Sequence, residues 1–204
     1  MNRTIRLLVI SDVLLLTGLG LISPILAIFI KENLIGGTIA AAGLAGTIYL
    51  ITKSLVQLPF SKYVDRHDHR VKFLIIGTFI ISLVPFLYIF STHIFHIYLA
   101  QFIYGIGAGL VYPCWLSLFS THLDKKKEGF EWSMYSTSVG IGVAIAAAVG
   151  GTIAQFVGFK VTFILTGIAA LIGASILFGL EKKESLKKIE TKHYHSRRKS
   201  IERI

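Results

Sequence analysis

The sequence predicts an all-α membrane protein with six transmembrane helices, and three observations predict this fold class. Hydrophobic residues make up 53% of the 204-residue chain and charged residues only 16%, too little charge to cover a soluble domain of this size. Six apolar segments are each long enough, as helices, to cross the roughly 30 Å apolar core of a bilayer. Short connections join these segments, so we expect consecutive helices to be antiparallel neighbours.

The predicted spans differ in the charge that they carry. The first two contain one charged residue each, Asp12 and Lys53, and the last four contain no Asp, Glu, Lys or Arg. The first apolar run is too long for the core of a signal peptide, so we expect it to remain as a helix. The spans are residues 7–30, 38–60, 73–90, 97–119, 132–157 and 161–180, which form a bundle of residues 1–180 before a basic tail of residues 181–204.

Lysine and arginine are distributed asymmetrically among the connections. The N-terminal segment, the second and fourth connections and the tail hold 18 of the 21 basic residues, whereas the opposite connections hold only Lys31 and Lys160. The positive-inside rule therefore predicts that both termini are cytoplasmic. We expect the protein to be in the plasma (cytoplasmic) membrane. The net charge of +10 follows from this bias and requires no nucleic-acid partner. The tail is expected to lie beside anionic lipid headgroups.

The first and fourth spans both contain the pattern G-x-G-L-x-x-P. An odd number of crossings separates the two copies, so they run in opposite directions across the bilayer, as in a 3+3 inverted repeat. Each proline lacks an amide donor and frees the carbonyl four residues earlier, which predicts helix breaks beside a mid-membrane cavity at Gly20 to Pro24 and at Gly109 to Pro113. A pure packing role for these residues remains open.

The two intramembrane charges are the first candidates for a functional site. Asp12 and Lys53 are at a similar depth from the predicted cytoplasmic side, and we expect them to be partners that line a water-accessible cavity. The alternatives are an interfacial Asp12 and a Lys53 that extends to the headgroups. Tyr49 and Gln57 share one helix face with Lys53. The fourth span adds the candidate pathway residues Gln101, Tyr104, Tyr112 and Trp115, whose aromatic members could instead face lipid.

The segment between the second and third spans resembles the signature loop of the major facilitator superfamily, G-x-x-x-D-R-x-G-R-[RK]-x-x-L. Asp65, Arg66 and Arg70 match this pattern, whereas Ser61 replaces its first glycine. The resemblance implies a gating loop in which Asp65 helps to latch the cytoplasmic side of a transporter. The alternative is an ordinary basic turn.

Two further segments resemble patterns of the same family. The fourth span is similar to R-x-x-x-G-x-G-x-G, but Gln101 replaces the arginine, so the proton-coupling role of that arginine is in doubt here. The fifth span is similar to the antiporter pattern G-x-x-x-G-P-x-x-G-G and implies a hinge, with simple helix packing as the alternative. The residues of this segment are Gly142, Ala146, Ala147, Gly150 and Gly151.

The resemblance covers roughly residues 5 to 180 and implies one six-helix half of a secondary transporter for a small solute. Alternating access requires two such bundles around one site, so we expect a homodimer, a separate second half, or a truncated product. The rival hypothesis is a membrane scaffold or regulatory subunit that does not transport. The sequence suggests no enzyme, cofactor or metal site, because no catalytic set or cluster of ligating side chains is present.

Overall fold

The computed structural model describes residues 2–67 and 69–181, and the predicted basic tail lies outside the described residues apart from Glu181. This part of the chain is almost entirely helical and contains no strand, only an isolated bridge between Ile35 and His93. The helices are α1 (Arg3–Gly20), α2 (Leu26–Asn33), α3 (Ile39–Arg66), α4 (Arg70–Ile89), α5 (Ile94–His122), α6 (Glu128–Phe156) and α7 (Phe159–Ile176).

Five of the described helices are long and apolar enough to cross a membrane, namely α3 to α7. The chain is therefore an integral membrane protein that crosses the bilayer several times. Residues 7–30 do not form one continuous helix, because α1 ends at Gly20 and turns precede α2, at the position where the sequence indicated a helix break. The amide groups of Leu21 and Ile22 donate to carbonyls three residues back, and Pro24 has no amide N–H with which to continue the helix.

The predicted break in the fourth span does not occur, because α5 is helical through Gly109 and Pro113. Neighbouring helices hold this segment on both sides. A Cβ atom on Gly109 would lie 2.7 Å from a side-chain atom of α3 and 3.0 Å from the Lys53 carbonyl oxygen. Such close packing supports the helix where the proline removes one of its hydrogen bonds.

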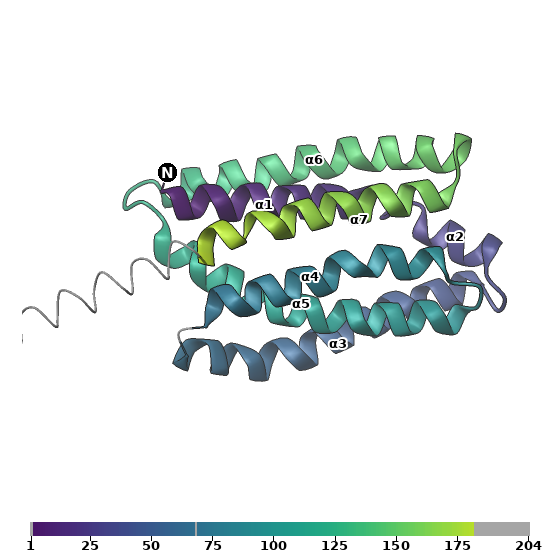
Figure 1. Ribbon diagram of the computed structural model, residues 1–204, viewed down its shortest axis with the longest axis horizontal. Coiled ribbons are helices and arrows are strands. Elements are labelled where there is room, and N and C mark those ends of the chain that lie inside the picture. Colours follow the sequence, from purple (N-terminus) through teal and green to yellow (C-terminus); the bar gives the residue numbers. More distant parts are fainter. Residues whose placement is uncertain (1, 68, 182–204) are drawn as a thin grey trace, which may run out of the picture.

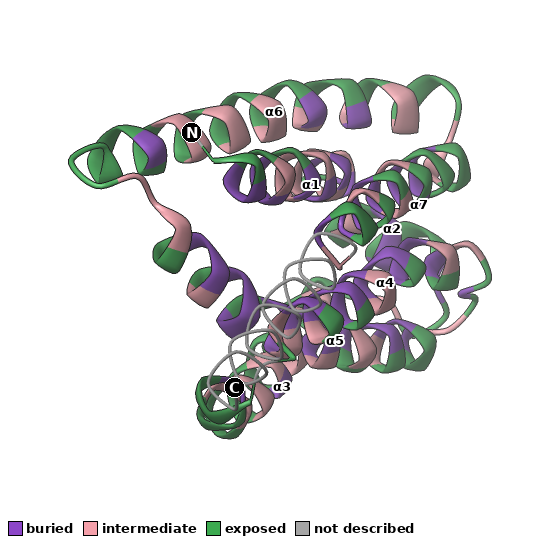
Figure 2. Ribbon diagram, turned by 60° about the vertical axis from the view of Figure 1, so that its left-hand side comes forward, coloured by how far each residue is buried: buried purple, intermediate pink, exposed green. Residues whose placement is uncertain are grey.

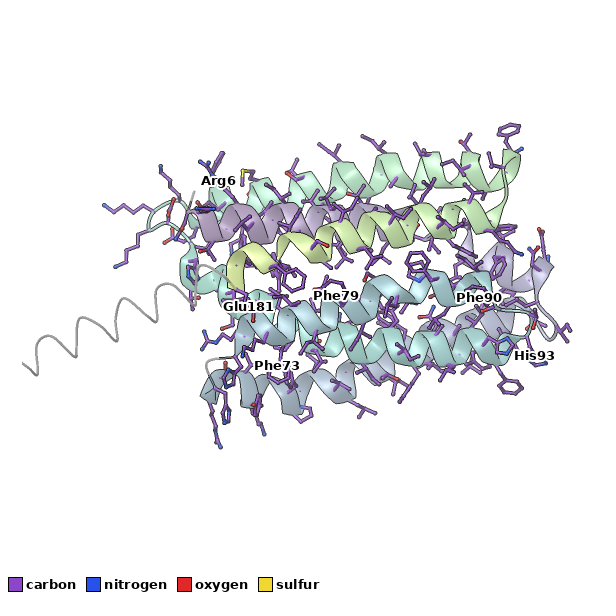
Figure 3. All side chains as sticks on the ribbon, in the orientation of Figure 1. Arg6, Phe73, Phe79, Phe90, His93 and Glu181 are labelled. Carbon is purple, nitrogen blue, oxygen red and sulfur yellow. The ribbon has the colours of Figure 1, made fainter. Side chains whose placement is uncertain are left out.

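Helices that are consecutive in the sequence are not always neighbours in space. The main contacts of α1 are with α6 and α7, whereas α5 packs on α3 and α4, and α4 packs on α7 (Figure 1). The expectation that consecutive spans are neighbours therefore fails for α1 and α3, whereas α2 does pack on α3. Figure 3 shows Arg6, Phe73 and Glu181 at one end of the bundle, here called the Arg6 end, and Phe90 and His93 at the opposite end, the His93 end.

The helix contacts have the symmetry expected of two triplets of helices. The interval from the start of α3 to the start of α6 is 89 residues, and the interval from α4 to α7 is the same. Exchanging α1 with α5, α3 with α6 and α4 with α7 converts the pairs α1–α6 and α1–α7 into α5–α3 and α5–α4. These exchanges match the contacts observed, as a 3+3 repeat requires.

The glycines of the repeated G-x-G pattern make equivalent contacts in the two triplets. A Cβ atom on Gly18 would lie 3.0 Å from a side chain of α7, and one on Gly107 would lie 2.9 Å from a carbonyl of α4. A Cβ on Gly20 would lie 3.2 Å from α6, and one on Gly109 would lie 2.7 Å from α3. The pattern thus lets α1 and α5 approach two helices each, which supports its packing role.

The outer faces of the bundle are apolar, as the surface of a protein in lipid must be. Figure 2 shows exposed residues along most of α3 and α6, with buried residues on the faces that meet other helices. Large side chains such as Leu55, Leu58 and Phe156 are 70%, 71% and 77% exposed. Contact with lipid hydrocarbon would cover these groups without any cost in backbone hydrogen bonds, because every helix satisfies its own.

Candidate functional site

A cavity of about 400 Å³ lies among α1, α3, α4, α5 and α6. It contains six of the eight residues that the sequence suggested for a solute pathway. Leucine, isoleucine, valine and alanine side chains make up most of the remaining lining, so the few polar groups stand out against an apolar wall. The six predicted residues in its wall are Asp12, Tyr49, Lys53, Tyr104, Tyr112 and Trp115.

Asp12 is held by a tyrosine and not by Lys53. The Tyr135 hydroxyl donates a hydrogen bond of 2.5 Å to Asp12 Oδ2, which ties α1 to α6. No ion pair joins Asp12 to Lys53 in the structure described for residues 2–67 and 69–181, so the predicted partnership is wrong. The reason is the packing order of the helices, because the neighbour of α1 at this depth is α6. The adjacent Ser11 hydroxyl donates to the Gly173 carbonyl at 2.7 Å and anchors α1 to α7.

Lys53 enters the same cavity from α3 and is half-buried. Its Nζ atom lies 4.9 Å from the centroid of the Tyr112 ring, a cation–π contact between α3 and α5. In the described part of the chain no carboxylate pairs with this ammonium group. One turn earlier on α3, the Tyr49 ring stacks on the Tyr104 ring with centroids 4.4 Å apart.

A cluster of aromatic side chains from α5 and α6 borders the cavity on the side of the Arg6 end. Trp115 of α5 stacks on Phe119 at 4.7 Å and contacts Tyr135 of α6 at 4.6 Å between centroids. Trp132 of α6 packs on Phe119 at 4.7 Å. Trp132 and Tyr135 were not predicted as cavity residues from the sequence, although their spacing of three residues places them on one face of α6, which was the available signal.

A second cavity of about 450 Å³ adjoins the first toward the His93 end. The two share Leu16, Leu19 and Tyr104 in their walls, and the second also contains Gln101, which is 5% exposed. Gly20 and Ser23 line it as well, so the observed interruption between α1 and α2 borders this space. Gln57, the remaining predicted residue, lines neither of these two cavities and is half-buried on α3.

The segment predicted as a gating loop is mostly helical. Ser61, Asp65 and Arg66 belong to the last turns of α3, and Arg70 is the first residue of α4, so only residues 67–69 connect the helices. Ser61 replaces the glycine of the family pattern and donates its hydroxyl hydrogen bond to the Leu58 carbonyl at 2.8 Å within α3. Asp65 and Arg66 are both exposed at the Arg6 end.

The small residues of α6 pack this helix against α1. Gly142 and Gly150 leave no room for a side chain next to α1, and Ala146 between them is 4% exposed. Ala147 and Gly151 lie beside this stripe and are half-buried, and Gly151 has open space where a Cβ would stand. The geometry of the stripe supports close helix packing.

The described residues contain no group of three or more His, Cys, Asp or Glu side chains able to hold a metal ion. The fold and the two cavities indicate a helical membrane protein with an internal repeat and a partly polar interior. The model of the Major Facilitator Superfamily matches residues 8–203, and the chain belongs to this family of membrane transporters.

Known proteins with similar sequences are transporters or resistance proteins. An uncharacterised transporter of the same superfamily from Methanocaldococcus jannaschii is 22% identical over 87% of this chain and 45% of its own length. The benzoate transport protein of Acinetobacter baylyi is 28% identical over 64% of this chain and 29% of its own length. The quinolone resistance protein NorA of Staphylococcus aureus is 23% identical over 91% of this chain and 47% of its own length.

A solved structure shows the same fold. The crystal structure of the POT family transporter PepTSo aligns with a TM-score of 0.70 at 17% identity, over 89% of this chain and 38% of the other. This chain thus spans less than half the length of these relatives.

Proposed function

We propose that the chain supplies one six-helix bundle of a secondary transporter that moves a small solute across the membrane by alternating access. In this proposal α1 and α2 together form the first span, and α3 to α7 form the other five. The observation that carries the proposal is the cavity that contains both Asp12 and Lys53. Charged side chains inside a bilayer are costly to maintain, and such groups commonly mark solute or ion pathways.

A second bundle completes the transporter in this proposal. It is a second copy of the chain, a separate half, or a further segment of a longer chain. The faces of α3 and α6 support the presence of a partner, because Gly43, Gly46, Gly140 and Gly151 have no heavy atom within 4 Å of an added Cβ. Another bundle could therefore approach these helices closely and enclose the solute between the two.

The proposal places both termini in the cytoplasm and the protein in the plasma membrane. Figure 3 supports one common side for the basic connections, because Arg6, Phe73 and Glu181 lie together at the Arg6 end. Exposed Asp65 and Arg66 are at this end, where they could contact the second bundle and latch it. The motion would open the two adjoining cavities to one side of the membrane at a time, while the Asp12–Tyr135 hydrogen bond holds α1 to α6.

Flux into lipid vesicles that contain the purified protein tests this function. Benzoate and a quinolone are the first solutes to try, because relatives bear these names. We expect Asp12→Asn and Lys53→Met to abolish flux while the protein still inserts and keeps its helix content. Lys62→Met is the matched control, since Lys62 is exposed on α3 outside the cavity. A scaffold would show no protein-dependent flux, and these changes would alter only its stability.

A further inference from the structure

Lys53 is a cation in the wall of an apolar cavity, and the structure gives it no anionic partner. Its Nζ atom lies 4.9 Å from the centroid of the Tyr112 ring, and no hydrogen bond or ion pair of this ammonium group is present among the described residues. A ring face attracts a cation through its quadrupole but carries no net negative charge, so it does not neutralise the ammonium group as a carboxylate would. The ammonium group thus retains most of its capacity to bind an anion that enters the cavity.

Asp12, by contrast, already has a donor. The Tyr135 hydroxyl reaches its Oδ2 at 2.5 Å from the neighbouring helix. The two charged side chains in the cavity wall therefore differ, since Asp12 has a hydrogen-bond partner and Lys53 has only a ring contact. A solute with a negative group gains a new charge-assisted contact at Lys53, whereas a solute with a positive group must compete with Tyr135 for Asp12.

Several aromatic ring faces of the cavity are already covered, unlike those of a cage for an organic cation. Such a cage offers open ring faces to the ligand. Here Lys53 occupies the face of Tyr112, Tyr49 and Tyr104 stack on each other at 4.4 Å, and Trp115 stacks on Phe119 at 4.7 Å. Aliphatic side chains such as Leu15, Leu16, Leu19, Ile81, Val111 and Leu116 supply the rest of the wall.

From this geometry we propose that the cavity binds an apolar organic acid, a molecule with one carboxylate on an apolar body, and that Lys53 is its counter-ion. The carboxylate draws the ammonium group away from the Tyr112 ring, and the apolar body contacts the aliphatic wall. A volume of about 400 Å³ admits a molecule with one or two rings. The inference rests on the proposed function for the transport of this acid, but its binding can be measured separately.

The protein contains its own reporter for binding. Its two tryptophans, Trp115 and Trp132, both line this cavity, so intrinsic fluorescence responds to its contents. We would titrate the full chain in nanodiscs with benzoate, benzamide and benzylamine, which have nearly the same shape but are negative, neutral and positive. Benzoate is expected to give a saturable change, with half-saturation at least tenfold lower than that of benzamide, and benzylamine is expected to bind no better than benzamide.

Variants assign the effect to one side chain. Lys53→Met is expected to raise the half-saturation for benzoate to the value for benzamide, and Lys53→Arg, which keeps the charge, is expected to retain most of the response. Lys62→Met, on the same helix outside the cavity, is the control and should match the wild type. Each variant must elute from size exclusion as the wild type does and keep its far-UV circular dichroism.

Four outcomes would overturn the inference: no saturable response to benzoate, equal affinity for benzoate and benzamide, tighter binding of benzylamine, or an unchanged Lys53→Met variant. These outcomes are distinct from failure of the proposed function. If another solute, but not benzoate, is transported in a manner that depends on Asp12 and Lys53, the proposed transport function stands and the inferred organic-acid ligand is wrong. If benzoate binds in a Lys53-dependent manner but no solute is transported, the binding site stands and the proposed transport function is wrong.

Discussion

Removal of the Tyr135 hydroxyl is the most specific perturbation of the site. Tyr135→Phe keeps the ring, which packs against Trp115, and deletes the donor that lies 2.5 Å from Asp12 Oδ2. Hydrogen bonds to charged groups contribute about 1.5–3 kcal/mol in soluble proteins. Measured interhelical bonds in membranes are weaker, about 0.6 kcal/mol on average and at most about 1.7. For this short, partly buried bond we expect a coupling energy near the upper end of the membrane values, about 1–1.7 kcal/mol.

A double-mutant cycle measures that coupling. The free energy of unfolding would be determined by titration with sodium dodecyl sulfate in mixed micelles for the wild type, Tyr135→Phe, Asp12→Ala and the double variant. The cycle removes contributions that the two side chains make independently of each other. Tyr63→Phe is the control, because Tyr63 is 37% exposed and belongs to α3, which is not among the main contacts of α1. A coupling below about 0.3 kcal/mol would refute the reasoning that this bond ties α1 to α6.

The remaining predictions concern packing and use the same unfolding assay. Gly109→Ala should destabilise the bundle by about 1–3 kcal/mol, because its Cβ would stand 2.7 Å from a side-chain atom of α3. Gly43→Ala, with open space at its Cβ, should be neutral or stabilise α3 by up to about 1 kcal/mol, and equal effects of the two changes would contradict this explanation. Ser11→Ala removes the hydrogen bond of 2.7 Å to the Gly173 carbonyl and should cost about 1 kcal/mol; an unchanged free energy of unfolding would show that this bond does not anchor α1.

Hydropathy predicted the helices well because each span must satisfy its own backbone in lipid. Each of the last five predicted spans overlaps one long helix, from α3 to α7. Hydropathy could not predict the helix ends, since polar residues continue a helix into the interface, as Ser61, Asp65 and Arg66 do on α3. The shared G-x-G-L-x-x-P pattern did not determine the backbone conformation either, because the chain turns after Gly20 but stays helical through Gly109.

The cavity residues could be predicted in part, for a physical reason. Helical periodicity placed Tyr49 and Lys53 on one face of α3, and both line the cavity. Depth alone suggested Lys53 as the partner of Asp12, but a partner also depends on which helices are adjacent. The contact of α1 with α6 arises from the arrangement of the two triplets and not from proximity in the sequence, so Tyr135 was missed.

Alternating exposure of the cavity is the central claim, and site-directed labelling tests it most directly. Leu16 lies in the walls of both cavities, and Cys114 is the single cysteine of the chain. We would place Leu16→Cys in a Cys114→Ala background and add a membrane-impermeant maleimide to right-side-out and to inside-out vesicles. If the cavity is exposed alternately, we expect the cysteine to be labelled in both kinds of vesicle, and we expect solute to raise the labelling rate in one kind and lower it in the other. Labelling from one side only, with or without solute, would contradict alternating access.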